Sequence, residues 1–174
     1  DLKAKQTTDF INIIKSNLID IKEDGSIWLD QNYFTYATGL KMVNEPKWEK
    51  LFGLKKRDPE SKLLQVHCNL GLAIQTVTEE IVIKMAKEAK RLTKSDYLCL
   101  SGGVALNCVA NGKLQLEKIF KEIFIQPAAG DAGGALGAAY AGNYLFYNQK
   151  RWINKEEDSM KGSYLGPEYN SSQI

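Results

Sequence analysis

The sequence predicts an α/β fold with parallel strands, and three observations lead to this prediction. A short apolar run at residues 97–100 ends in a glycine turn and leads into a helical stretch. A second run, at residues 123–126, ends in another glycine turn and leads into another helix. A long amphipathic helix precedes both runs. Strand, glycine turn and helix, followed by the same again, is typical of a sheet whose strands are parallel.

The elements before residue 60 are expected to be local ones. Residues 7–16 have helical periodicity. Two alternating stretches, 18–22 and 26–30, flank an Asp-Gly turn and predict a β-hairpin. Residues 33–36 are rich in aromatic side chains and predict a further strand, and a short helix is expected from Trp48 to Phe52.

Helical patterns account for much of the remainder. Over residues 61–92, apolar side chains recur at spacings of three and four, with a break expected near Cys68-Asn69. Further helices are expected from Val104 to about Lys118 and, built of small residues, up to about Tyr147. The polar tail after Lys150 has the composition of a linker.

Composition narrows the classes of protein. The chain has 174 residues, 44% hydrophobic and 25% charged, which fits one globular domain. A net charge of +2 gives no long-range attraction for nucleic acid or an anionic membrane, so neither partner is expected. No apolar run approaches the roughly 20 residues that cross a bilayer, and the first residues lack a signal core. We therefore expect a cytoplasmic protein.

The three cysteines predict neither a disulfide framework nor a zinc site. Cys68, Cys99 and Cys108 are odd in number and contain no Cys-x-x-Cys pair. Cys99 lies within an apolar run and is expected to be buried. A single histidine, His67, excludes a site that needs two imidazoles from this chain alone.

The first glycine turn is a candidate phosphate site. In an open α/β sheet, ligands bind where strand ends meet helix N-termini, and the helix dipole favours anions there. Gly102 and Gly103 leave the backbone accessible to a phosphate. The hydroxyl of Ser101 can donate a hydrogen bond, and Asn107 follows about one turn later. The alternative is that the glycines serve only a turn that requires positive φ.

The second glycine turn adds an acidic side chain. Asp131 lies between Gly130 and Gly133-Gly134 at the start of a helix. It fits an N-cap, which accepts a hydrogen bond from the first helical turn. It also fits an oxygen ligand of a divalent cation beside a phosphate, and the two roles are compatible because a carboxylate has two oxygens. Known nucleotide fingerprints are absent: neither a Walker A loop nor a G-x-G-x-x-G pattern occurs.

These two turns resemble a known family. Residues 100–107, Leu-Ser-Gly-Gly-Val-Ala-Leu-Asn, and residues 126–133, Gln-Pro-Ala-Ala-Gly-Asp-Ala-Gly, look like the nodulation-protein and antibiotic-type carbamoyltransferases. Residues 107–114, 23–26 and 162–169 are similar to the same family. The likeness therefore touches most of the chain.

The resemblance implies an actin/hexokinase-type, ribonuclease H-like half-domain, with helices packed on a mixed sheet. Residues 1–150 would be the second half of the carbamoyl-transfer domain, and residues 151–174 an exit segment towards a further domain. Family members make carbamoyl-adenylate from carbamoyl phosphate and ATP in that further domain. The actin-like domain then transfers the carbamoyl group to the hydroxyl of a small-molecule acceptor.

The resemblance also implies the site residues. Ser101, Gly102, Gly103 and Asn107 would line the nucleotide, together with Gly130 and Gly133 of the second turn. Asp131 would be a ligand of an iron-type divalent ion, with magnesium or manganese as alternatives. The other metal ligands would be histidines and an aspartate of the first half of the domain. The histidines have no counterpart here, so the isolated chain is expected to be inactive.

Two other readings of the sequence stay open. One is a threonylcarbamoyl-transferring enzyme that acts on transfer RNA, and the other is a non-catalytic nucleotide-binding scaffold. No catalytic residue is assigned from the sequence. His67 is expected to pack or to lie on the surface. Arg57, in the basic turn at 55–59, could meet a phosphate or be a solvated loop charge.

Overall fold

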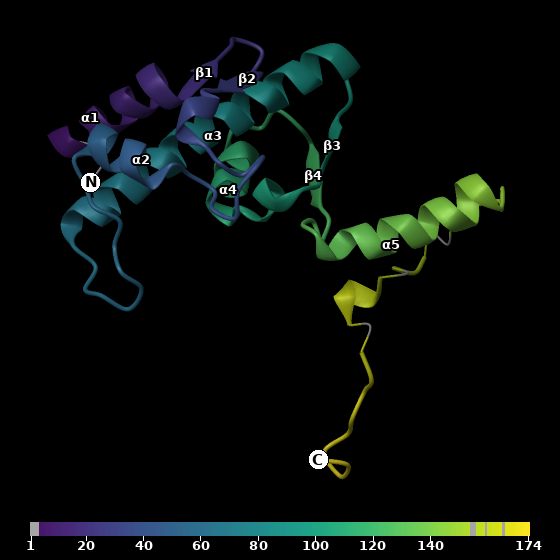
Figure 1. Ribbon diagram of the computed structural model, residues 1–174. Helices are drawn as coiled ribbons and strands as arrows, with labels where there is room; N and C mark the ends of the chain where they lie inside the picture. Colours follow the sequence, from purple (N-terminus) through teal and green to yellow (C-terminus); the bar gives the residue numbers. More distant parts are fainter. Residues whose placement is uncertain (1–3, 154–155, 159, 165) are drawn as a thin grey trace. The chain divides into compact units, whose positions relative to one another are not determined.

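Helices and short strands alternate along the chain, which is a mixed α/β protein (Figure 1). The computed structural model describes residues 4–153, 156–158, 160–164 and 166–174. The chain divides into two units, one of residues 1–98 and 107–123, the other of residues 99–106 and 124–174.

The first unit begins with a helix and a hairpin, as predicted. Helix α1 (Lys5–Ile13) continues as a π-helical turn (Ile14–Leu18). Strands β1 (Ile19–Ile21) and β2 (Ile27–Leu29) pair antiparallel, with Ile19 opposite Leu29. The turn between them needs glycine at position 25, where φ is +81°.

The prediction of a strand at residues 33–36 is wrong. A 3-10 turn (Gln31–Tyr33) forms instead, because the Asp30 side chain accepts a hydrogen bond from the Asn32 N–H at 3.0 Å. Such local side-chain bonds compete with strand pairing. Only Phe34 makes a single antiparallel bridge, to Val43.

Helices α2 (Glu45–Phe52) and α3 (Gln65–Thr93) follow. Asn44 caps α2, and Gly53 ends it in the left-handed conformation. The break predicted near Cys68-Asn69 is wrong, because α3 is continuous. Asn69 is buried, and both ends of its side-chain amide are hydrogen-bonded. Its Oδ1 accepts from Gln65 at 2.9 Å, and its Nδ2 donates to Gln6 of α1 at 2.7 Å.

The hydrophobic core of the first unit lies where α1 and α2 meet α3. Figure 1 shows α1 lying along α3. Ala73 of α3 is fully buried, and its small side chain lets the apolar face of α1 approach closely. The buried members of the core are Phe10, Ile14, Leu18, Phe52, Ala73 and Val77.

A charged contact attaches α4 (Cys108–Leu116) to α3. Glu79 of α3 is 5% exposed and forms an ion pair with Lys113 of α4. The amide of Gln75 also donates to Glu79, at 2.9 Å. A buried carboxylate therefore has both a cation and a hydrogen bond to offset its desolvation.

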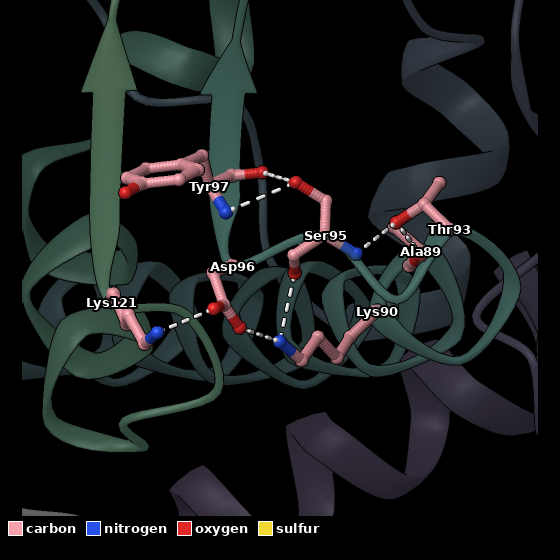
Figure 2. A network of polar contacts seen from close by, with 7 residues as sticks. All are labelled: Ala89, Lys90, Thr93, Ser95, Asp96, Tyr97 and Lys121. Carbon is pink, nitrogen blue, oxygen red and sulfur yellow. Dashed lines mark hydrogen bonds and ion pairs between the residues drawn. The ribbon is translucent and has the colours of Figure 1, made fainter.

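Strands β3 (Tyr97–Leu100) and β4 (Glu122–Ile125) form the second sheet and run in parallel, as predicted (Figure 2). The Lys121 N–H donates to the Asp96 carbonyl at one end, and the Gln126 N–H to the Leu100 carbonyl at the other.

The prediction that these strands are buried is wrong, and so is the burial of Cys99. Alternate side chains of each strand are exposed, among them Tyr97, Cys99 and Phe124. In a strand, successive side chains point to opposite faces. Within the part of the chain that the structure describes, one face of the pair is left uncovered.

An ion-pair network joins the beginnings of β3 and β4 to the end of α3. The Asp96 carboxylate accepts from Lys121 at 2.6 Å and from Lys90 at 2.8 Å, and Lys90 also donates to the Ser95 carbonyl (Figure 2). The bonds from Lys121 and Lys90 lower the pKa of Asp96 from 3.8 to about 2.

The second unit contains α5 (Ala132–Ala141), which continues as a π-helical turn (Gly142–Phe146), and a 3-10 turn in the tail (Lys161–Ser163). Tyr140 and Tyr144 stack with their ring centroids 5.7 Å apart. Among the described residues, no helix combines the length and apolarity that a membrane crossing requires.

Replacing Gly25 by alanine should destabilise the first unit. The new Cβ would lie 2.4 Å from the Met85 backbone nitrogen of α3, and the backbone has positive φ. We expect the free energy of unfolding, measured with urea, to fall by roughly 1–3 kcal/mol. Gly112→Ala in α4, where nothing lies within 4 Å, is the matched control and should gain about 1 kcal/mol. Equal effects at both positions would contradict the close approach at Gly25.

Stability in acid should depend on Asp96. The pKa of Asp96 is lower in the folded protein than in the unfolded chain. Its contribution to the free energy of unfolding is therefore complete above the ordinary pKa of 3.8 and is lost as pH falls through about 2. Asp96→Asn should lower the free energy of unfolding at neutral pH and flatten its decline over that acidic range. Urea titrations at a series of pH values measure both effects. Asp9→Asn, at an exposed carboxylate of α1, is the matched control for the removal of one surface charge.

Candidate functional site

The two glycine turns lie against each other in the second unit. The Gly102 N–H donates to the Ala129 carbonyl at 2.7 Å, which ties the turn after β3 to the turn after β4. Gly102 adopts φ +96°, a conformation in which glycine has no steric penalty. Since this N–H is already bonded, Gly102 would serve a ligand by its lack of a side chain and not as a donor.

The two turns and one face of α5 line an open cavity of about 720 Å³. This is within the range of small-molecule sites. Glycine and alanine form most of the wall. The lining residues are Ser101, Gly102, Gly103, Gln126, Ala128, Ala129, Gly130, Asp131, Gly133, Gly134, Leu136, Gly137 and Tyr140.

Gly133 is required by the fold of the second turn. A Cβ at this position would lie 2.1 Å from the Ala128 carbonyl oxygen, far inside a van der Waals contact. The Gly133 N–H donates to the Gly130 carbonyl at 3.1 Å, and the Gly134 N–H to the Asp131 carbonyl at 3.1 Å. The backbone thus folds back on itself just before α5 begins.

Asp131 occupies the N-cap position of α5, but its side chain makes no capping hydrogen bond. The expected capping contact is therefore absent. The cause is local: Asp131 has helical φ and ψ of −57° and −34°, whereas a capping side chain requires an extended backbone. The donors of the first turn use backbone carbonyls instead, and the exposed carboxylate lines the cavity.

Asp131 is the one charged residue among those that line the cavity. An anionic ligand there would meet the positive end of the α5 dipole but also a carboxylate. The repulsion between two anions in close contact requires a cation to offset it. The cavity as formed by these residues thus suits an uncharged ligand, or an anion that arrives with a cation.

Asn107 has a structural contact in the first unit. It caps α4, where its Oδ1 accepts from the Ala110 N–H at 3.0 Å. Its amide group also exchanges two hydrogen bonds with Gln75 of α3, at 2.9 and 3.1 Å. The remaining predicted residues of the nucleotide site all line the cavity between the glycine turns; they are Ser101, Gly102, Gly103, Gly130 and Gly133.

A complete metal site is not formed by the described residues. They contain no group of three or more histidine, cysteine, aspartate or glutamate side chains placed to hold an ion. Asp131 would supply one oxygen ligand. His67 belongs to the first unit, where its Nδ1 accepts a hydrogen bond from the N–H of Leu64, the N-cap residue of α3, at 3.1 Å.

Among the lining residues that the sequence did not assign to the site, three have larger side chains: Gln126, Leu136 and Tyr140. A signal for two of them was present. Gly133, Leu136 and Tyr140 are spaced by three and four residues, which places them on one face of α5. Gln126 follows β4 directly, and its N–H pairs with Leu100, so its position depends on strand register.

Comparisons with known proteins give a consistent result. The family model of the carbamoyltransferase N-terminus matches residues 3–140. An uncharacterized protein of Synechocystis sp. is 47% identical over 165 residues, which cover 95% of this chain and 26% of that protein. Nodulation protein NolO of Bradyrhizobium diazoefficiens is 37% identical over 109 residues, 63% of this chain and 19% of the relative.

A third relative is nodulation protein NolNO of Sinorhizobium fredii, 38% identical over 109 residues. These residues are 63% of this chain and 15% of that protein. The chain therefore spans at most 26% of the length of these three curated relatives.

The two neighbouring glycines of the second turn should respond differently to alanine. Gly133→Ala must displace the Ala128 carbonyl, and we expect a cost of roughly 1–3 kcal/mol together with faster amide exchange in residues 128–134. Gly134→Ala, which has nothing within 4 Å of its added Cβ, should leave exchange in this turn unchanged. Hydrogen exchange measures both variants. Unchanged exchange in Gly133→Ala would refute the tight turn.

Proposed function

Because this chain belongs to the carbamoyltransferase family, we propose that it forms part of the actin-like transfer domain of an ATP-dependent O-carbamoyltransferase. In the proposed reaction the carbamoyl carbon passes from carbamoyl-adenylate to the hydroxyl oxygen of a small-molecule acceptor. The bond between that carbon and the phosphate oxygen breaks, AMP leaves, and the hydroxyl proton is lost. The alternative assignments, transfer-RNA modification and a scaffold role, have no specific observation in their favour.

The observation that supports this proposal is the isolated, uncapped carboxylate of Asp131 in a glycine-walled cavity. A carboxylate at a helix N-terminus ordinarily bonds the first turn. Here it does not, and it lies beside a backbone surface that a phosphate could approach. We propose that the Asp131 carboxylate would hold a divalent cation, whose charge would offset that of a nucleotide phosphate.

The other predicted residues have more limited roles in this proposal. Gly103, Gly130 and Gly133 leave room for close approach of a phosphate, and the Ser101 hydroxyl supplies a donor. Asn107 is bonded to Gln75, so contact with a ligand would require that pair to open. One carboxylate does not make a metal site, and we assign no reaction step to the ion, whose other ligands would lie outside this chain.

The wider arrangement is part of the same proposal. Residues 1–150 would belong to the transfer domain, and residues 151–174 would lead towards a domain that makes carbamoyl-adenylate from carbamoyl phosphate and ATP. The chain spans 26% of its 47% identical relative, which leaves ample length for such a domain in proteins of this kind.

Asp131→Asn tests whether the Asp131 carboxylate holds a cation, because the substitution keeps the side-chain volume and removes the charge. In the intact protein we expect AMP to bind at least about tenfold more tightly with a divalent cation than without, and we expect the variant to lose this difference. Isothermal titration calorimetry with manganese, with magnesium and with chelator measures it. Carbamoyl transfer should fall in parallel.

Glu122→Gln, at an exposed carboxylate of β4, is the matched control and should bind AMP as the parent protein does. If AMP binding by Asp131→Asn keeps its full dependence on the divalent cation, the proposed role of the Asp131 carboxylate is wrong. If it also keeps full transfer activity, the cavity belongs to a scaffold and not to an active site.

A further inference from the structure

A second cavity of about 700 Å³ lies entirely within the first unit. Its walls are the loop before α2, α2 itself, the basic turn that follows it, and the first turns of α3. All of its lining residues fall between positions 40 and 74, and none of them lines the glycine-walled cavity. Nothing in the proposed carbamoyl transfer uses it.

The floor of this cavity is apolar and rigid. It includes Trp48, Phe52, Leu54 and Leu70. The indole of Trp48 is held by a hydrogen bond from its Nε1 to the Tyr33 carbonyl at 2.8 Å, and its ring lies 5.3 Å from that of Phe52. An aromatic surface fixed in this manner can receive a planar ligand without first being ordered.

The rim carries an excess of positive charge. Four cationic side chains, Lys41, Lys55, Lys56 and Arg57, and two carboxylates line the cavity. Glu45 offsets Lys41 at 2.8 Å and Lys56 at 2.6 Å. Bonds from these two lysines lower the pKa of Glu45 to about 2, so the carboxylate stays ionised and both partners stay occupied near neutral pH.

The second carboxylate, Glu49, also has a local partner, because its Oε1 accepts from the Lys56 N–H at 3.2 Å. Arg57 donates one N–H to the Ser61 carbonyl, which orients the guanidinium and leaves other donors of the fork available. Lys55, in the described part of the chain, lies near these groups with no carboxylate partner of its own. Among the described residues, Lys55 and Arg57 are therefore the two cations of the rim for which no ion pair with a carboxylate is formed.

His67 also lines this cavity. Its Nδ1 accepts a hydrogen bond from the Leu64 N–H, so the ring N–H that can donate to a ligand is at Nε2. A small-molecule site of this kind combines an apolar floor with a few oriented polar groups. Ammonium and guanidinium groups are not metal ligands, and a cationic ligand would be repelled.

We propose that this cavity binds a small organic anion with a planar, apolar body. The body would lie on Trp48 and Leu70, and a carboxylate or phosphate head group would bond Lys55 and Arg57. Charge-assisted bonds from an arginine fork suit both head groups. The site would be independent of Asp131 and of the nucleotide.

The test uses 8-anilinonaphthalene-1-sulfonate, an anion with a planar naphthalene ring, with the intact protein. Energy transfer from Trp48 to the bound probe reports occupancy, and Trp48→Phe identifies the donor. We expect one probe per chain and an affinity about tenfold higher than that of N-phenyl-1-naphthylamine, which has the same rings without the sulfonate. Equal affinity for the two probes, or no binding, would overturn the proposal.

The double variant Lys55→Gln, Arg57→Gln should weaken the sulfonate probe about tenfold and leave the neutral probe unchanged. Lys62→Gln, at an exposed lysine outside the cavity lining, is the matched control, and circular dichroism verifies that each variant is folded. Unchanged sulfonate affinity in the folded double variant would refute the role of these cations.

Competition identifies the head group. Displacement of the probe by phenyl phosphate or by benzoate supports the proposal and distinguishes a phosphate from a carboxylate. If inorganic phosphate displaces it as well as phenyl phosphate does, the apolar floor adds nothing and the proposal is wrong. Asp131→Asn should bind the probe normally, which separates failure at this site from failure of the proposed function.

Discussion

The packing of α1 against the middle of α3 is the contact on which the first unit depends. Ala73 is fully buried at this contact, and Asn69 satisfies its amide across it. Because α3 is continuous over 29 residues, it extends beyond the core and holds other parts in place. Glu79 pairs with Lys113 of α4, and Lys90 pairs with the aspartate that begins β3. One uninterrupted helix thus supports the core, α4 and the start of the parallel strands.

The two cavities have opposite chemistry. One has walls of glycine and alanine and a single charged group, the Asp131 carboxylate. The other has an aromatic floor at Trp48 and more cations than carboxylates at its rim. A phosphate can approach the bare backbone of the first closely but needs a cation beside Asp131. The second supplies its own positive charge and an apolar surface, so it suits a ligand that carries both features.

Local signals predicted the elements well where the decisive interactions lie within a few residues. The Asp-Gly turn at Asp24-Gly25 predicted the hairpin, and the spacing of apolar residues predicted α3. The two failures have different causes, one local and one distant in the chain. The aromatic residues at 33–36 favour a strand, but Asp30 bonds the next turn and starts a 3-10 helix. Asn69 suggested a break in α3, but a partner 63 positions away along the chain satisfies its amide.

For the candidate site, the sequence by itself determined which residues stand in each glycine turn and that an acidic side chain follows β4. Only the tertiary structure decided that the Gly102 N–H is bonded to Ala129, that Asp131 leaves its helix uncapped, and that Tyr140 joins the lining. It also decided that Cys99 is exposed. Sequence patterns indicate which backbone conformations each residue can adopt. They do not indicate which acceptor each N–H group bonds or which side chains cover each face of the sheet, because these depend on strand register and on groups distant in the chain.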